Sequence, residues 1–216
     1  FFKFSDCIIV NSKIFKKKID SIFNVKSVCI YNPLNQKEIL KKCRIKISRN
    51  FFRINKSLRL INVARFTDQK NHLLLLESLR DIKHKLNFEL LLIGYGPNKK
   101  IINNFIKKNN LSNRIKVLNY DDNPYKYIKQ SDVFILTSNF EGLPNVLLEA
   151  LCLKKIIIST NCPTGPSEIL MNGKYGLLTK LNDRNNLSRV ILNVGRSKRN
   201  YQKLANRGFK SLSRFS

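Results

Sequence analysis

The sequence predicts an α/β domain in which a parallel sheet is covered by helices on both faces. From about residue 58 onward, short apolar runs alternate with longer amphipathic segments, which is the pattern of consecutive βαβ units. The runs fit parallel strands that are buried on both faces. With 216 residues and 43% apolar content, the chain is long enough to bury a sizeable core.

Each apolar run from residue 58 onward is expected to form a strand, and each longer segment between two runs a helix. The strands are expected at residues 58–65, 88–96, 114–120, 132–138 and 155–160. The helices are expected at residues 71–83, 99–110, 123–131 and 144–153, and helix-compatible segments follow residue 184.

The beginning of the chain differs from this pattern. Residues 5–12 and 27–33 are expected to be strands on either side of a basic helix, and residues 34–57 then pass through Lys, Arg, Asn and Ser. We therefore expect a domain boundary or hinge near residues 33–40. Because the sequence opens at Phe1 in a strand-like run, we expect it to be part of a longer polypeptide.

The net charge of the chain indicates which classes of partner it can attract. The sequence has 41 Lys and Arg against 14 Asp and Glu, a net charge of +27 that attracts polyanions such as nucleic acid or anionic lipid. The basic residues are spread along the chain together with many Ile and Asn. Compositional drift and a membrane-facing surface therefore explain the charge equally well. No run is long enough to span a membrane and no signal peptide is recognisable, so we expect a cytoplasmic protein, peripheral at the inner face of the membrane.

The cysteines indicate neither a disulfide framework nor a zinc site. They are odd in number, widely spaced and never arranged as C-x-x-C. We expect reduced thiols at Cys7, Cys29, Cys43, Cys152 and Cys162.

Ligands of open parallel sheets bind beyond the carboxyl ends of the strands, so the residues that follow each strand are candidates. Arg65 and Lys70, in ARFTDQKNH, suit a diphosphate, although two cations in so basic a chain could be incidental. Gly94 and Gly96, in IGYGPNKK, let a ligand approach the backbone closely. They lack the full G-x-G-x-x-G pattern and fit a plain turn as well.

The stretch NFEGLPNVLLEALCLKK, residues 139–155, places a sharp turn at the start of a helix. Gly142 and Pro144 form that turn, so the amides near Leu143, Asn145 and Val146 point outward and can bind a phosphate.

Carboxylates accompany this turn. Glu141 would lie beside whatever the phosphate carries, and Glu149 could accept hydrogen bonds from polyol hydroxyls. The leucines around Glu149 argue against a solvated helix face. Further along, in STNCPTGPSEIL, Glu168 either caps a helix that begins there or reaches the ligand pocket.

Together these junctions resemble the donor-binding half of a retaining glycosyltransferase of the GT-B fold, from family 4 (glycosyltransferase group 1). The matching pieces, in the family's order over about residues 58–180, are NVARFTDQKNHLLLLESL, LLIGYGP, NPYKYIKQSDVFILTSNFEGLPNVLLEAL, STNCPTGPSEIL and NGKYGLL. Glu141 and Glu149, separated by seven residues, match the E-x7-E signature. The resemblance implies that Glu141 contacts the donor sugar and Glu149 the ribose, while Arg65 and Lys70 hold the diphosphate.

The same resemblance implies transfer of a sugar from a UDP-linked or other nucleotide diphosphate sugar to a glycan or lipid-linked acceptor, with retention of configuration. It implies no essential metal, because cations and amides stabilise the leaving diphosphate. The nucleobase is expected near Val117 and Leu118, at the end of a strand, and Glu168 is a candidate for the donor pocket.

By the resemblance, residues 1–40 are the tail of an acceptor domain and a hinge, and residues 41–195 a Rossmann-like domain that binds the nucleotide sugar. Residues 196–216 are a truncated C-terminal helical segment, and the N-terminal domain is largely absent. The chain is expected to bind a donor but to need an acceptor domain, in cis or in trans, for activity.

Other functions stay open. The chain could be a non-catalytic donor-binding subunit or a sugar-nucleotide epimerase or hydrolase. Specific nucleic-acid binding is disfavoured, because the basic residues form no motif and most aromatic residues fall in predicted cores.

Other polar residues in this region are expected to have structural roles. His72 and His84 are expected to be structural or solvated, and Asp121 with Asp122 to cap a turn or helix rather than bind a metal. No nucleophilic role is expected for Cys152 or Cys162.

Overall fold

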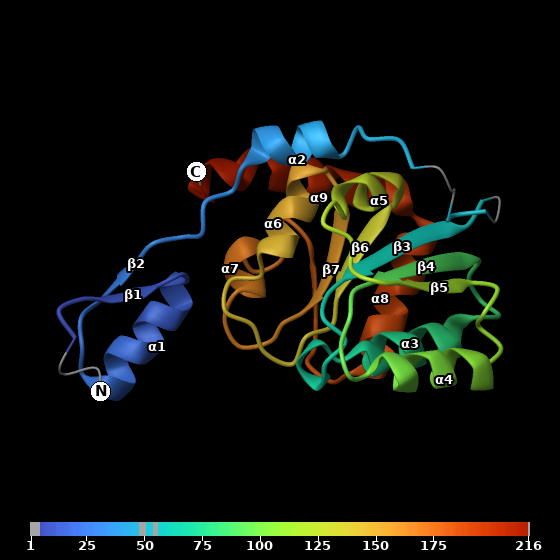
Figure 1. The fold of residues 1–216 in the computed structure, drawn as a ribbon, viewed down its shortest axis with the longest axis horizontal. Coiled ribbons are helices and arrows are strands. Elements are labelled where there is room, and N and C mark those ends of the chain that lie inside the picture. Colours follow the sequence, from blue (N-terminus) through green and yellow to red (C-terminus); the bar gives the residue numbers. More distant parts are fainter. Residues whose placement is uncertain (1–4, 48–50, 54–55, 216) are drawn as a thin grey trace.

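The computed structural model describes residues 5–47, 51–53 and 56–215. Phe1 and Ser216, at the two ends, and parts of the stretch 34–57 lie outside the described residues. Within them the chain forms a parallel sheet of order β5-β4-β3-β6-β7-β8 and a separate parallel pair, β1-β2 (Figure 1).

The sheet confirms the predicted strands and adds one at its edge. Its members are β3 Leu58–Val63, β4 Phe88–Ile93, β5 Ile115–Leu118, β6 Val133–Leu136, β7 Ile156–Thr160 and β8 Leu177–Thr179. The strand β8 was not predicted, because three residues are too short for an apolar pattern to stand out.

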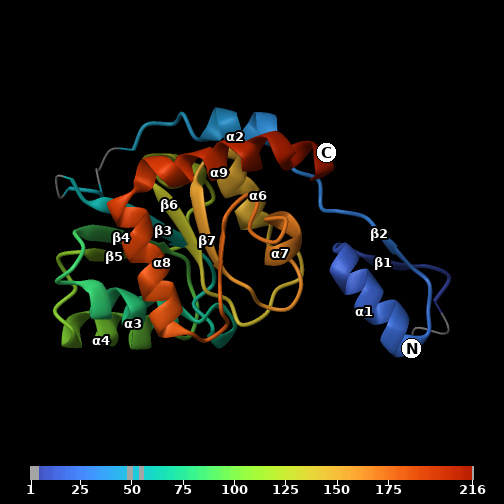
Figure 2. The same ribbon diagram turned by 180° about the vertical axis from the view of Figure 1, so that it is seen from behind.

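Helices cover both faces of this sheet, as predicted (Figures 1 and 2). Helices α3 His72–Ile82, α4 Lys99–Lys108 and α8 Arg184–Arg196 lie on one face. Helices α5 Tyr125–Gln130, α6 Asn145–Cys152 and the short α7 Pro166–Ile169 lie on the other. Helix α9, Lys198–Lys210, packs on α6, α8 and β7, and the 3-10 helix η3, Ser211–Phe215, follows it.

Apolar side chains fill the space between the sheet and each helical layer. The strands contribute to both layers, because successive side chains point to opposite faces. In β4, Leu90 and Leu92 pack on the side of α3, and Leu91 and Ile93 pack on the side of α6. This two-sided burial is the reason that the strands read as continuous apolar runs.

Helix α2, Gln36–Lys42, lies in a stretch for which the sequence predicted no element. Asn35 begins it, because its side chain accepts a hydrogen bond from the Glu38 amide at 3.0 Å. Ile39 is buried against α6, and the helix also contacts α5. Seven residues with one buried position leave too little periodicity to predict a helix. The helix runs across residue 40, at which the expected first domain ends.

The N-terminal segment consists of β1 Ile8–Val10, α1 Lys13–Phe23 and β2 Ser27–Cys29, which confirms the predicted strand, basic helix and strand. Figures 1 and 2 show it beside the main sheet, with the beginning of α1 directed at α7. None of the residues of α1 is fully buried. The position of this segment therefore depends on a small number of contacts.

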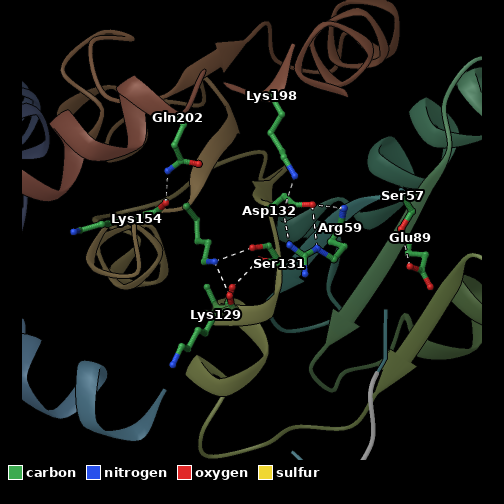
Figure 3. A network of polar contacts seen from close by, with 11 residues as sticks. Ser57, Arg59, Glu89, Lys129, Ser131, Asp132, Lys154, Lys198 and Gln202 are labelled. Carbon is green, nitrogen blue, oxygen red and sulfur yellow. Dashed lines mark hydrogen bonds and ion pairs between the residues drawn. The ribbon is translucent and has the colours of Figure 1, made fainter. Parts of the chain in front are cut away.

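A polar network ties the amino ends of the central strands to the helices (Figure 3). Asp132 accepts hydrogen bonds from the Arg59 guanidinium at 2.7 Å and from Lys198 Nζ at 3.1 Å. These contacts lower the pKa of Asp132 against the effect of burial. Lys155 Nζ donates to the carbonyl oxygens of Lys129, at 2.7 Å, and Ser131, at 2.8 Å. It thereby occupies carbonyls at the end of α5.

Burial lowers the pKa of Lys155 from 10.5 to about 8. Between about pH 8 and pH 10.5, Lys155 binds fewer protons in the folded state than in the unfolded chain, so rising pH favours folding. The unfolding free energy of the wild type relative to Lys155→Met should therefore rise by about 3 kcal/mol across this interval. Chemical denaturation at a series of pH values measures it.

Lys154 is the matched control, because its side chain is exposed. The difference between the wild type and Lys154→Met should show no such rise. A Lys155→Met difference that does not depend on pH would contradict a desolvated ammonium at this position.

Candidate functional site

The strand order reverses between β3 and β6. From β3 the chain proceeds outward through β4 to β5, and it then returns to β6 on the other side of β3 and continues to β7 and β8. A crevice for ligands opens at the carboxyl ends of two such neighbouring strands. Arg65 and Lys70 follow β3, and Glu141 follows β6, so the predicted catalytic residues all lie at this point.

The loops after β3 and β6 are joined by hydrogen bonds across this crevice. The Asn139 amide donates to the Gln69 carbonyl at 2.8 Å, and the Gln69 side chain donates to the Phe140 carbonyl at 3.0 Å. The Asn71 side-chain amide donates to Asn139 Oδ1 at 3.0 Å. The two loops therefore form one rigid wall of the site.

A cavity of about 330 Å³ lies at the same edge of the sheet. It is lined by residues that follow β3, β4 and β5 and by residues of α5 and α6: Val63, Ala64, Arg65, Ile93, Gly94, Tyr95, Tyr120, Asp121, Asp122, Pro124, Tyr125 and Glu149. The structure thus brings Arg65, Gly94 and Glu149 together. The Arg65 side chain is exposed, and no ion pair holds its guanidinium within the described part of the chain.

Glu149 is half-buried, so its face of α6 is only partly exposed to solvent. Burial raises its pKa, and the Tyr125 hydroxyl donates a hydrogen bond to the carboxylate. In turn, burial and the Glu149 charge raise the pKa of Tyr125 to about 12. Both residues also line a second hollow of about 170 Å³, together with Asn145 at the start of α6. Glu149 therefore borders two neighbouring hollows at this edge of the sheet.

Lys70 and Glu141 form an ion pair of 2.6 Å between Nζ and Oε1, with side chains only 14% and 7% exposed. Ser138 Oγ also donates to Glu141 Oε1, at 2.6 Å. Thr164 donates to the Glu141 carbonyl oxygen, and Thr137 Oγ1 to the Lys70 carbonyl at 3.1 Å. The pair is fixed in place, and its two charges offset each other.

The start of α6 is free of side-chain caps. Pro144 occupies the cap position without a side-chain hydrogen bond, so the first amides of α6, those of Asn145 and Val146, keep their partial positive charge for a ligand. Gly142 is exposed, whereas Leu143 is buried. The predicted open turn is therefore present.

Gly94 and Gly96 allow two loops to touch. A Cβ at Gly94 would lie 2.0 Å from the Ala64 carbonyl oxygen, and one at Gly96 would lie 2.5 Å from the Phe66 carbonyl oxygen. Only backbone without side chains fits there, which packs the loop after β4 on the loop after β3. Gly94 lines the cavity, whereas Gly96 is not among its lining residues.

Val117 and Leu118 lie at the end of β5, in register with Leu92 and Ile93 of β4. Their side chains pack against the two apolar clusters and are partly exposed, and the Leu118 carbonyl accepts a hydrogen bond from the Gly94 amide at 3.2 Å. Beyond them, Asn119 is exposed and accepts a hydrogen bond from Lys99 Nζ at 2.5 Å.

Glu168 lies outside the cavity that holds Arg65 and Glu149. It lines a hollow of about 430 Å³ between α1 and α7, next to Lys13, Tyr31 and Arg214. Its carboxylate accepts hydrogen bonds from the first amides of α1. The expectation that it caps its own helix is wrong: Gly165, at the cap position before α7, has no side chain to form a cap, and Glu168 caps α1 instead.

Sequence reasoning missed the tyrosines of the cavity. Tyr95 and Tyr120 are 57% and 63% exposed, and their rings meet edge to face with centroids 5.8 Å apart. A hydrogen bond to Asp122 raises the pKa of Tyr120. Both tyrosines lie inside the predicted strands 88–96 and 114–120, which extend too far: β4 ends at Ile93 and β5 at Leu118, so the two rings lie beyond the strand ends.

Contacts within the fold account for several of the other titratable residues. His72 is buried, its Nε2 lies 3.0 Å from Asn62 Oδ1, and desolvation lowers its pKa to about 4. Asp121 caps a turn by accepting from the Asn123 amide at 2.8 Å. Burial raises the pKa values of Cys152 and Cys162 to about 11. No cluster of three or more potential metal ligands of the His, Cys, Asp or Glu type occurs among the described residues.

The chain is similar in sequence to known glycosyltransferases. The family described as Glycosyl transferases group 1 matches residues 44–211. An uncharacterized glycosyltransferase of Methanocaldococcus jannaschii is 36% identical over 205 residues, which cover 83% of this chain and 49% of the relative. The N-acetylgalactosamine-N,N'-diacetylbacillosaminyl-diphospho-undecaprenol 4-alpha-N-acetylgalactosaminyltransferase of Campylobacter jejuni is 29% identical over 186 residues, 85% of this chain and 49% of that protein.

The fold agrees with this similarity. The crystal structure of Anabaena HepE in complex with UDP matches with a TM-score of 0.83 at 17% identity, over 99% of this chain and 61% of that chain. At such identity the likeness concerns the fold, a GT-B Rossmann-like domain. This chain spans about half the length of the curated relatives it matches. Family match and fold together confirm the resemblance drawn from the motifs: the chain belongs to the group 1 glycosyl transferases of the GT-B fold.

Proposed function

We propose that this chain is the donor-binding part of a retaining glycosyltransferase that uses a nucleotide diphosphate sugar, UDP-linked, and acts on a glycan or lipid-linked acceptor. The observation that carries the proposal is that Arg65 and Glu149 line one cavity at the strand reversal, while Glu149 also lines a second hollow with Asn145, at the uncapped start of α6. A cation, a half-buried carboxylate and open amides are groups that can recognise a diphosphate and a ribose. HepE, a structural neighbour, binds UDP at its own site.

In the proposed complex, the diphosphate lies between Arg65 and the amides of Asn145 and Val146. Glu149 accepts hydrogen bonds from the ribose hydroxyls, and Tyr125 holds that carboxylate in position. The base lies towards the end of β5, beside the exposed rings of Tyr95 and Tyr120.

Negative charge develops on the leaving diphosphate as the bond to the sugar breaks. Arg65 and the α6 amides stabilise this charge and are already oriented, so they require little reorganisation. Lys70 donates to the diphosphate from a position fixed by Glu141 at 2.6 Å, and because Glu141 offsets its charge, Arg65 and the amides supply most of the positive potential. Because these groups supply the positive potential, we propose a reaction without an essential metal. Glu141 contacts the sugar from the same turn.

The acceptor is proposed to be bound by a second Rossmann-like domain, in cis or in trans. Residues 1–40 are its tail and the hinge, residues 41–195 the donor domain and residues 196–216 the C-terminal helical segment. The pair β1-β2 supports this proposal, because Ile9, Val28 and Ile30 are each about half exposed or more and need a covering partner.

A lipid-linked acceptor would place the enzyme in the cytoplasm at the inner face of the membrane. The name of the Campylobacter jejuni relative includes diphospho-undecaprenol, and a charge of +27 favours an anionic surface. None of the helices in the described ranges is long and apolar enough to cross a membrane.

The donor site is tested by calorimetric titration of the chain with UDP, GDP and ADP, for the wild type and for Arg65→Ala/Lys70→Ala. Binding of UDP in preference to GDP and ADP is expected, and the double variant should lose about 100-fold in affinity through lost charged hydrogen bonds. The selectivity should persist at about 0.5 M salt, at which distant charges are screened.

The control for this titration is Lys107→Ala/Lys108→Ala, on α4 away from the crevice, which should bind UDP like the wild type. Equal, weak binding of all three nucleotides that disappears with salt would contradict a built site and leave only the attraction of a basic surface.

The role of Glu149 is tested with UDP and an analogue without both ribose hydroxyls. Glu149→Gln should lower the affinity for UDP about tenfold, because it removes a charged hydrogen-bond acceptor. Tyr125→Phe should lower it less, because it removes only the hydroxyl that holds the Glu149 carboxylate in position. Neither change should affect binding of the analogue. Calorimetry measures both. Equal losses of affinity for UDP and for the analogue would mean that Glu149 maintains the fold and does not bind the ribose hydroxyls.

A further inference from the structure

The Glu168 carboxylate joins the N-terminal segment to the donor domain. Oε2 accepts from Ser12 Oγ at 2.6 Å and from the Ile14 amide at 3.2 Å. Oε1 accepts from the Lys13 amide at 2.9 Å and from the Tyr31 hydroxyl at 2.5 Å. All four donors come from a part of the chain more than 130 residues away in sequence. One half-buried side chain therefore fixes both the start of α1 and the end of β2.

These contacts favour the ionised carboxylate. Hydrogen bonds from Ser12, Tyr31 and the α1 amides lower the pKa of Glu168 in spite of its burial. An anion is also stabilised at the positive end of a helix. Ser12 Oγ in turn accepts from the Phe15 amide at 3.1 Å, so the first amides of α1 are satisfied by Ser12 and Glu168 together.

We call the hydrogen bonds of Glu168 to Ser12, Lys13, Ile14 and Tyr31 the Glu168 clamp. Asn11 directly precedes Ser12 and lies against the Glu141–Gly142 turn. A Cβ placed on Gly142 would lie 3.5 Å from Asn11 Oδ1 and 3.9 Å from Asn11 Nδ2. The side chain is half-buried, and nowhere in the described residues does a hydrogen bond occupy its amide. Within the described ranges, one side-chain hydrogen bond besides those of Glu168 joins residues 5–33 to the donor domain. It runs from Asn32 Nδ2 to Asn145 Oδ1, at 3.0 Å.

We propose that Asn11 contacts the sugar of the donor and that Glu168 is the positioning residue that holds Asn11 against Gly142. The inference rests on the proposed function, because it places the donor at the Glu141–Gly142 turn. A side-chain amide both donates and accepts hydrogen bonds, which suits a sugar hydroxyl. Glu168 acts through Asn11 and does not touch the donor itself.

The clamp is needed because packing alone does not position this segment. None of the α1 residues is fully buried, and of the segment's described apolar residues only Val10 counts as buried. The separation of Asn11 from Gly142 therefore depends on the Glu168 contacts, which lie one residue further along the chain. Loss of the carboxylate would release Asn11 without removing any group from the nucleotide cavity.

A double-mutant cycle on this chain tests the proposal. The affinities for UDP and for UDP-glucose, UDP-galactose and UDP-N-acetylglucosamine are measured by calorimetry for Asn11→Ala, Glu168→Ala and the double variant. Each single variant should lose about fivefold in affinity for the best UDP-sugar and less than about twofold for UDP. The double variant should be no weaker than either single variant, because both changes remove the same contact.

Conservative variants separate positioning from direct contact. Ser12→Ala and Tyr31→Phe each remove one donor to Glu168 and leave its carboxylate in place, so each should reproduce part of the loss for the UDP-sugar. Glu168→Gln should retain more affinity than Glu168→Ala, since its amide oxygen still accepts. If Glu168 touched the donor, its loss would add to that of Asn11→Ala, and Ser12→Ala would have no effect.

A purely structural role gives a third pattern, in which UDP and the UDP-sugars lose affinity equally or not at all while thermal stability falls. Additive losses or this pattern would overturn the proposal. Amide hydrogen exchange of Lys13 and Ile14 provides an independent reading of the clamp and should accelerate in Glu168→Ala. If the wild type binds no nucleotide, the proposed function and the role of Asn11 both fall, while the exchange still reports the clamp.

Discussion

The reversal of strand order between β3 and β6 is the constraint on which the rest of this molecule depends. The connections that leave these two neighbouring strands turn to opposite sides of the sheet, so no crossover covers their carboxyl ends. The loops after them are left facing each other and are joined through residues 69–71 and 139–140. The Lys70–Glu141 pair, the start of α6 and the cavity beside Arg65 are all located by that single reversal.

The local electrostatics of the site differ from those of the whole chain. Although the net charge is +27, the cavity lining contains Arg65 as its one cation among the described residues, against Asp121, Asp122 and Glu149. Asp121 is paired with Lys126 at 2.8 Å, and Glu149 is partly protected by burial. A general attraction of polyanions therefore does not explain this cavity. Its mixture of one cation, carboxylates and tyrosines suits a ligand that combines a diphosphate with hydroxyl groups and a ring.

Features that depend on residues close in sequence could be predicted. The strands β3, β4, β6 and β7 read directly as apolar runs, because both of their faces are buried. The turn before α6 could be predicted from Gly142 and Pro144, whose backbone preferences are local. Helix α2 and strand β8 escaped prediction because each is short and buries little, so no periodic pattern identifies it.

Contacts between distant residues could not be predicted in the same way. Glu168 follows a strand, as ligand-binding residues do, and its sequence context does not reveal that its partners lie at Ser12 and Tyr31. The ion pair of Lys70 with Glu141 was likewise not anticipated, although both residues were selected as site residues. In each case the residue type was informative, whereas its partner was set by the packing of the N-terminal segment or of two loops.

The most direct test of the account is a residue-by-residue map of UDP binding by ¹H–¹⁵N NMR on this chain. Shifts are expected to concentrate on the amides of Gly94, Leu143, Asn145 and Val146 and on the Arg65 side chain. Shifts spread over the basic residues of α4, α8 and α9, with the start of α6 unchanged, would contradict a nucleotide site at the reversal of the sheet.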